Sequence, residues 1–200
     1  MRTSFTTALL SFSLVALVAT PVAAAESDAQ AVVSNYMKSW KADGLPATAV
    51  FFDPKGIEEV SEMMKPLLEM NDSKDGNPMR QMLRGPEFSA ADVAKLKSTE
   101  VFAMVLEMTE GAMQRQGGAT LETYKVLGAV PESDELVHVV ARATMKYRDT
   151  EVEQVNLIST QKRDGKWTIA MRPDLKQMVA GLRQQLVAGM AQQAKQDASR

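Results

Sequence analysis

Residues 136–171 read LVHVVARATMKYRDTEVEQVNLISTQKRDGKWTIAM, and this stretch decides the fold. Within 136–147, apolar and polar side chains alternate, which is typical of a strand that buries one face. Asp164-Gly165 predicts a hairpin, because a type I′ turn needs positive φ at both of its central positions. Strands are therefore expected on both sides of this turn, over 152–162 and 166–171. The buried face of 136–147 is expected to hold Val137, Val139, Ala141, Ala143, Met145 and Tyr147.

The alternating pattern begins directly after Gly118, so we expect an antiparallel meander from residue 119 onward. A first strand over 119–130 and a turn at 131–134 precede 136–147, and a second turn lies at 148–150. The first three strands are longer than the usual strand of roughly 5–6 residues. Long antiparallel strands twist and curl, so one face of the sheet is expected to be concave.

Helical spacing of apolar residues precedes the sheet. A first helix is expected from about residue 29, because apolar residues recur there every three or four positions. Ser27 or Asp28 is expected to cap its start, and Gly44 with Pro46 to stop it. The short apolar segment 49–52 follows it.

Two further helical regions are expected before residue 118. The first covers 57–68 and contains Pro66, which predicts a kink or an earlier end. Residues 71–87 are rich in glycine and proline and are expected to form a loop. Ser89 and Asp92 resemble a capping box, and Ser98 is expected to cap a second segment that ends at Gly117-Gly118. These helices are expected to fill the concave face of the sheet.

The last segment, 173–200, is expected to be an amphipathic helix with a frayed end over 192–200. We expect its apolar stripe to dock on the protein's own domain or, as the alternative, on a second copy in a homo-oligomer. The fold class is therefore α+β, with N-terminal helices on a curved four-stranded antiparallel meander over 26–172 and an extra C-terminal helix. The stripe holds Leu175, Met178, Val179, Leu182, Leu186 and Met190.

Residues 1–25 have the features of a secretory signal. Arg2 is the only charge before Glu26, residues 8–19 form an apolar run too short to span a bilayer, and Ala23-Ala24-Ala25 is a small-residue cleavage site. We expect cleavage near Ala25, a periplasmic or secreted product and no stable membrane anchor. An uncleaved N-terminal anchor is the alternative.

The composition disfavours several chemistries. The 200 residues include no cysteine and one histidine, and the net charge is −2. Thiol chemistry is therefore excluded, a metal site or cofactor is not expected, and no basic footprint for nucleic acid is present.

Two stretches resemble the cone-shaped superfamily of nuclear transport factor 2 and ketosteroid isomerase. Residues 32–44, with Phe51-Phe52-Asp53-Pro54 after them, resemble its first helix and the step beyond it. Residues 162–169 resemble its final hairpin, in which a tryptophan (here Trp167) packs in the last strand. The resemblance implies a cone-like fold, which carries enzymes, binding proteins and assembly domains alike.

The expected function is non-enzymatic binding of a small apolar molecule or lipid, or of a protein partner. Candidate ligand-binding residues are Tyr36, Trp40, Phe52, Met104 and Trp167, and core packing is the alternative role for each. Methionine pairs such as Met63-Met64 also raise the alternative of copper(I), although core filling explains methionines at helical spacing.

An acid–base enzyme of the isomerase or dehydratase type is the alternative function. The resemblance implies a carboxylate in the cone for such an enzyme, and the strand carboxylates are Glu122, Glu151 and Glu153. The sequence shows no site that would raise the pKa of any of them. His138 has no hydroxyl partner or orienting carboxylate that can be recognised from spacing, so no catalytic residue is predicted.

Overall fold

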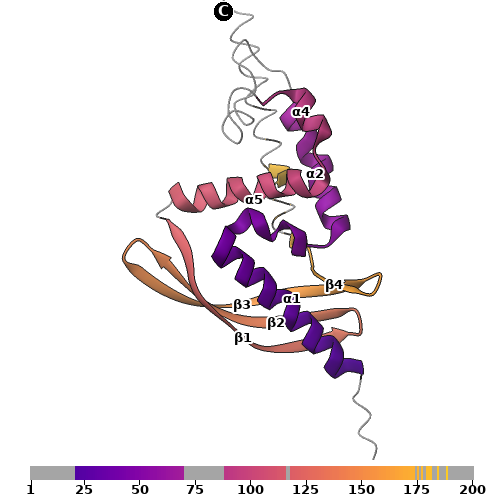
Figure 1. Ribbon diagram of the computed structural model, residues 1–200, viewed down its shortest axis with the longest axis vertical. Helices are drawn as coiled ribbons and strands as arrows, with labels where there is room; N and C mark the ends of the chain where they lie inside the picture. Colours follow the sequence, from indigo (N-terminus) through magenta and orange to yellow (C-terminus); the bar gives the residue numbers. More distant parts are fainter. Residues whose placement is uncertain are drawn as a thin grey trace, which may run out of the picture.

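A computed structural model describes residues 21–69, 88–115 and 118–173, together with 175, 177, 179–181, 184 and 188. Figure 1 shows helices on one side of a long, curved sheet. The helical elements come first: α1 (Pro21–Asp43), the 3-10 helix η1 (Leu45–Phe51), α2 (Pro54–Glu69), α4 (Ala90–Lys95) and α5 (Ser98–Arg115). The strands follow: β1 (Ala119–Ser133), β2 (Leu136–Tyr147), β3 (Thr150–Arg163) and β4 (Lys166–Ile169).

The predicted meander is confirmed. The four strands lie in the order β1-β2-β3-β4, and each neighbouring pair is antiparallel. Asp164 and Gly165 both have positive φ, at 51° and 78°, as a type I′ turn requires. The inward face of β2 is also as predicted, because its alternate residues from Val137 to Met145 are buried.

The predicted turn at 131–134 is wrong. Pro131 still pairs with Val137, and β1 continues to Ser133, so the turn lies at Asp134 and Glu135. A register shift between Pro131 and Ser133 accommodates the proline, which an edge strand tolerates because one side of its backbone is unpaired. β4 is shorter than the predicted 166–171 and ends at Ile169.

The helix boundaries differ from the sequence expectations in three places. α1 is already helical at Pro21, the first described residue, and not only from residues 27–28, since the alanines after Pro21 favour helix. α2 continues through Pro66 to Glu69, so the expected early end is wrong. The cap of α5 is Lys97 rather than Ser98: the Lys97 carbonyl accepts from the Val101 N–H, and the Glu100 side chain accepts from the Lys97 N–H at 2.7 Å.

Other local predictions are confirmed. Gly44 follows the end of α1 with φ of 84°. Ser89 and Asp92 form a reciprocal capping box at the start of α4. The segment expected near 49–52 lies mostly in η1, and Phe52 forms an isolated parallel bridge with Ile169. The expected loop 71–87 lies outside the described residues.

Two hydrophobic clusters form the core. The first joins η1, α2, α4 and α5, with Phe102 at 0% exposure. The second joins α1 to the inward face of the sheet, with Val33 and Val139 both at 0%. Only α1 lies across all four strands, so the expectation that all the helices fill the concave face is wrong: α2 and α4 lie away from the sheet (Figure 1).

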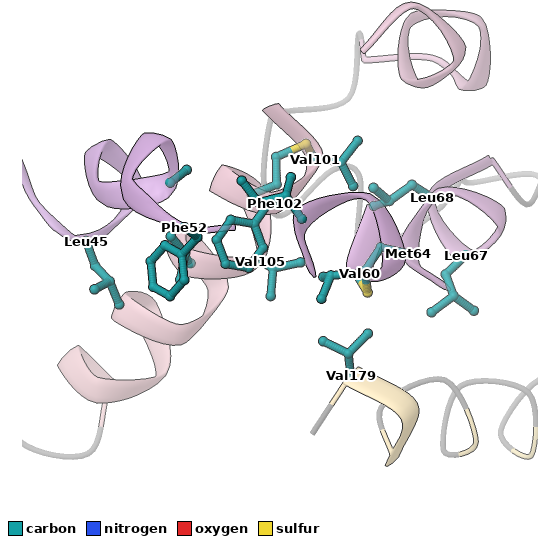
Figure 2. Close-up of a cluster of buried hydrophobic side chains, with 14 of the residues drawn as sticks. Leu45, Phe52, Val60, Met64, Leu67, Leu68, Val101, Phe102, Val105 and Val179 are labelled. Atoms are coloured by element: carbon teal, nitrogen blue, oxygen red, sulfur yellow. The ribbon is translucent and has the colours of Figure 1, made fainter. Parts of the chain in front are cut away.

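The C-terminal segment contributes to the first cluster. From residue 173 onward the described residues are helical, and Val179 is 1% exposed. Figure 2 shows Val179 on the side of α2 that carries Val60 and Met64. This part of the predicted stripe therefore docks on the protein's own helices. Met178, Leu182, Leu186 and Met190 lie outside the described residues.

The start of α2 is tied to the end of the sheet. Asp53 is 4% exposed, and its carboxylate accepts from the Gly56 N–H at 3.0 Å and from Arg163 Nε at 2.9 Å. The Asp53 N–H donates to the Ile169 carbonyl at 2.9 Å. α2 approaches the segment after β4 so closely that a Cβ placed on Gly56 would lie 2.6 Å from Cβ of Met171.

We predict that Gly56→Ala destabilises the protein by about 1–3 kcal/mol, the usual cost of overpacking. Gly111→Ala in α5 is the matched control, because its added Cβ would lie 3.6 Å from the Arg115 side chain. This control is expected to be neutral or to stabilise by up to about 1 kcal/mol through helix propensity. Urea unfolding of both variants measures the difference. Equal stability of the two would contradict the close approach.

Candidate functional site

A cavity of about 520 Å³ lies between α1 and the sheet, where the two hydrophobic clusters meet. Tyr36, Trp40 and Ile158 pack against both clusters and also line this space, which we call the cleft. Its volume falls within the roughly 300–1,000 Å³ of small-molecule sites. The cleft is lined by Tyr36, Met37, Trp40, Phe52, Met113, Ala143, Met145, Tyr147, residues 154–159, Ile169, Ala170 and Arg172.

The short β4 leaves the middle of β3 available to line the cleft. β4 pairs only with Thr160–Arg163. One more backbone hydrogen bond follows this ladder, from the Ala170 N–H to the Ser159 carbonyl at 2.9 Å. Within the described residues, no strand pairs with the outer edge of residues 150–158. Of these residues, 154–158 line the cleft.

One wall of the cleft is aromatic. The rings of Tyr36 and Trp40 lie one helical turn apart on α1, with centroids 6.2 Å apart. Phe52 packs edge-on against Tyr36 at 5.8 Å and against Phe102 at 5.1 Å. Because Phe102 is fully buried, this contact holds the aromatic wall to the helical cluster.

The polar groups of the cleft are few. Burial raises the pKa of Tyr36 from 10.0 to about 12, while the positive charge of Arg172 has a smaller, opposite effect. The phenol therefore keeps its proton at neutral pH. Arg172 is the only charged residue in the described lining, and it is exposed to solvent. The amides of Gln154 and Asn156 are the other large polar groups.

The five candidate ligand-binding residues do not all line the cleft. Tyr36, Trp40 and Phe52 line the cleft, whereas Met104 and Trp167 do not. Met104 is 2% exposed within the helical cluster, and Trp167 is 8% exposed beneath α1. In the described structure, the indole N–H of Trp167 is buried without a hydrogen-bond partner.

Methionine contributes to the cleft through different residues from those considered in the sequence. Met37, Met113 and Met145 line it, and none of them belongs to the clusters that suggested copper. Met64 and Met104 are buried among apolar side chains instead. The alternation in β2 pointed to Met145 as an inward residue, but spacing carried no signal that Met113, near the end of α5, reaches the same space.

The strand carboxylates lie elsewhere. Glu122, Glu151 and Glu153 are not among the described residues that line the cleft. The Glu122 carboxylate accepts from Thr120 at 3.1 Å, and Glu153 pairs with Arg142 at 3.4 Å on the outer face of the sheet. The cleft as described therefore lacks the carboxylate that the acid–base alternative requires.

His138 has partners that spacing did not reveal. Its Nδ1 lies 2.9 Å from Oγ of Ser159, and its Nε2 lies 2.6 Å from Oε2 of Glu132. The register places His138 opposite Ser159, and the extension of β1 beyond residue 130 brings Glu132 within reach. His138 therefore has a hydroxyl and a carboxylate neighbour that could not be recognised from the sequence. Neither His138 nor Glu132 lines the cleft.

No protein-family model, no curated protein and no solved structure matches this chain. Among the described residues, no helix has the length and apolar composition needed to cross a membrane.

The raised pKa of Tyr36 predicts a pH dependence of stability. Between pH 10 and about 12 the unfolded chain loses the phenolic proton while the folded protein keeps it, so this group's contribution to stability falls as pH rises. The absorbance of tyrosinate as a function of pH should show one phenol that ionises near pH 12 and is missing in Tyr36→Phe. If Tyr36→Phe instead removes a phenol that ionises near pH 10, Tyr36 is not buried as described.

Proposed function

We propose that this protein is an exported, non-enzymatic binding protein that takes a small apolar molecule into the cleft. The observation that carries the proposal is the cavity of about 520 Å³ with an aromatic wall at Tyr36 and Trp40. The cavity exceeds by far the few tens of Å³ below which an organic ligand is excluded, since binding pockets run to roughly 300–1,000 Å³. Apolar walls with a few polar groups are typical of such pockets.

A small molecule is favoured over a protein partner at the C-terminal helix. Val179 is buried in the protein's own helical cluster, and Leu175 packs against the same cluster. These described members of the stripe are therefore occupied within the chain, which leaves the cleft as the better-supported site.

We also propose membership in the cone-shaped superfamily of nuclear transport factor 2 and ketosteroid isomerase. Helices followed by a curved antiparallel sheet are compatible with that superfamily. In this proposal the cleft is the interior of the cone. The acid–base alternative is less well supported, because no carboxylate lines the described cleft.

The proposed export predicts a mature chain that begins at Glu26. Cleavage after Ala25 removes the first five residues of α1, while Ala29, Val33 and Met37, which anchor α1 on the sheet, remain. The intact mass of protein recovered from the periplasm or medium is expected to lack residues 1–25. A mass that includes residues 8–19 would show that this segment is retained as an anchor.

The proposed binding predicts that filling the cleft abolishes uptake of an apolar probe. Ala143 lines the cleft at 2% exposure, so Ala143→Leu places additional atoms in that space. With the neutral dye N-phenyl-1-naphthylamine, which fluoresces in apolar surroundings, we expect the variant to bind at least roughly tenfold more weakly, a loss of about 1.4 kcal/mol.

Thr144→Leu is the matched control for this measurement. Thr144 is the next residue on β2 and faces the opposite side of the sheet, where its hydroxyl lies 2.9 Å from that of Thr123. It is expected to leave dye binding unchanged. The proposal fails if the wild-type protein does not bind the dye, or if Ala143→Leu and Thr144→Leu bind it equally well.

A further inference from the structure

Residues 150–158 of β3 form an open edge of the sheet. β4 ends at Ile169, one more backbone hydrogen bond joins Ala170 to Ser159, and the described residues are helical from 173 onward. Among the described residues, no strand pairs with 150–158 on this side, and no backbone hydrogen bond outside the ladder with β2 reaches them. This edge contains neither proline nor lysine, with which natural proteins often protect an edge strand.

The backbone groups that face the open edge belong to the odd-numbered residues. The Lys162 N–H donates at 2.8 Å to the residue just before β2, whereas the Ser159 carbonyl accepts at 2.9 Å from the segment after β4. Peptide groups of successive strand residues point to opposite sides, and the pairing with β2 shows no register shift from Thr150 to Gln161. The N–H and C=O groups of Val155 and Leu157 therefore point away from β2, toward the open edge.

A strand added at this edge would place side chains on both faces of the sheet. Val155 and Leu157 are 59% and 64% exposed on the outer face, where the side chains of alternate residues of the added strand would lie beside them. Asn156 and Ile158 point to the inner side and line the cleft, so the remaining side chains of the added strand would point toward the cleft. β-Branched side chains suit both positions, because they pack well on a pleated surface.

The charge of this edge is concentrated at one end. Glu151 and Glu153 are exposed near the start of β3, whereas residues 154–159 carry no charge. Glu153 pairs with Arg142 at 3.4 Å, and Glu151 forms no ion pair with a described residue. A strand antiparallel to β3 would run in the direction of β4, so its C-terminal end would lie beside these glutamates. A basic C-terminal end therefore complements the edge, since opposite charges stabilise a cross-strand pair.

We propose that the edge of β3 over residues 151–157 binds an extended peptide segment of a protein partner, which has alternating β-branched side chains and a basic C-terminal end. The segment adds a fifth strand to the sheet, in the position that a longer β4 would occupy, and main-chain hydrogen bonds supply its affinity. This goes beyond the proposed function, which concerns a small molecule in the cleft. A second copy of the protein matches less well, because the charges on its own free edge, 150–158, are the same glutamates.

Fluorescence anisotropy with a labelled, end-capped peptide of sequence VTVTVTKK measures the binding. N-methylation of alternate residues tests the backbone pairing, because an extended strand directs only every second N–H toward its neighbour. We expect methylation of one set, the valines or the threonines, to weaken binding about tenfold, a loss of about 1.4 kcal/mol, and methylation of the other set to leave it unchanged. The peptide that ends in two glutamates instead of two lysines is expected to bind more weakly than the original.

Val155→Pro is the matching change in the protein. It removes an N–H that faces the open edge and leaves the ladder with β2 intact, as proline can at an edge strand. Val155→Thr keeps this N–H and the β-branched shape and is the control. We expect the proline variant to bind the peptide about tenfold more weakly and the threonine variant to bind it as the wild type does. Melting temperatures show whether both variants fold, and the methylated peptides carry the test on the wild-type protein if the proline variant does not.

Three results would overturn the proposal. The wild-type protein could fail to bind the peptide, or the two methylated peptides could bind it equally well, which would mean that main-chain pairing is not involved. Size-exclusion chromatography without peptide could also show a dimer that Val155→Pro dissociates and Val155→Thr does not, and this would assign the edge to a second copy. The measurement with N-phenyl-1-naphthylamine tests the cleft separately.

Discussion

One helix has to cover one face of a sheet that is larger than itself, and the rest of the structure follows from this mismatch. An α-helix with its side chains is about 10 Å wide, whereas four strands about 4.8 Å apart, each up to roughly 40 Å long, present a much larger face. α1 contacts all four strands, and the inward residues of β2 and β4 are the most completely buried. The middle of β3, beyond the short β4, remains only partly covered and borders the cleft.

The remaining helices stabilise this arrangement without covering the middle of β3. α2, α4 and α5 form their own hydrophobic cluster, and Tyr36, Trp40 and Phe52 connect that cluster to α1 and the sheet. The buried Asp53 carboxylate, bonded to Arg163 and to the start of α2, fixes where the helical layer meets the end of the sheet. The ring contact between Phe52 and Phe102 keeps the aromatic wall packed against the helical cluster.

The sheet was largely predictable because its signals are local. Alternation along 136–147 depends on each residue's own side chain, and the Asp164-Gly165 turn is specified by its backbone requirements. The helical residues before 27 and the passage of α2 through Pro66 were not predicted. In α2, tertiary packing outweighs the unfavourable local propensity of proline. Three of the five candidate ligand residues line the cleft, because helical spacing places Tyr36 and Trp40 on one side of α1. Spacing could not identify Arg172, the partners of His138 or the contribution of Met113, all of which depend on contacts between distant elements.

The proposed function requires that the space beside α1 remains open in the folded protein and accepts an apolar ligand. The most direct measurement is a crystal structure of the protein grown with N-phenyl-1-naphthylamine. The proposed function predicts electron density for the dye between Trp40 and Ile158. A structure in which the side chains of Met37, Met113 and Met145 fill this space, with no density for the ligand, would contradict it.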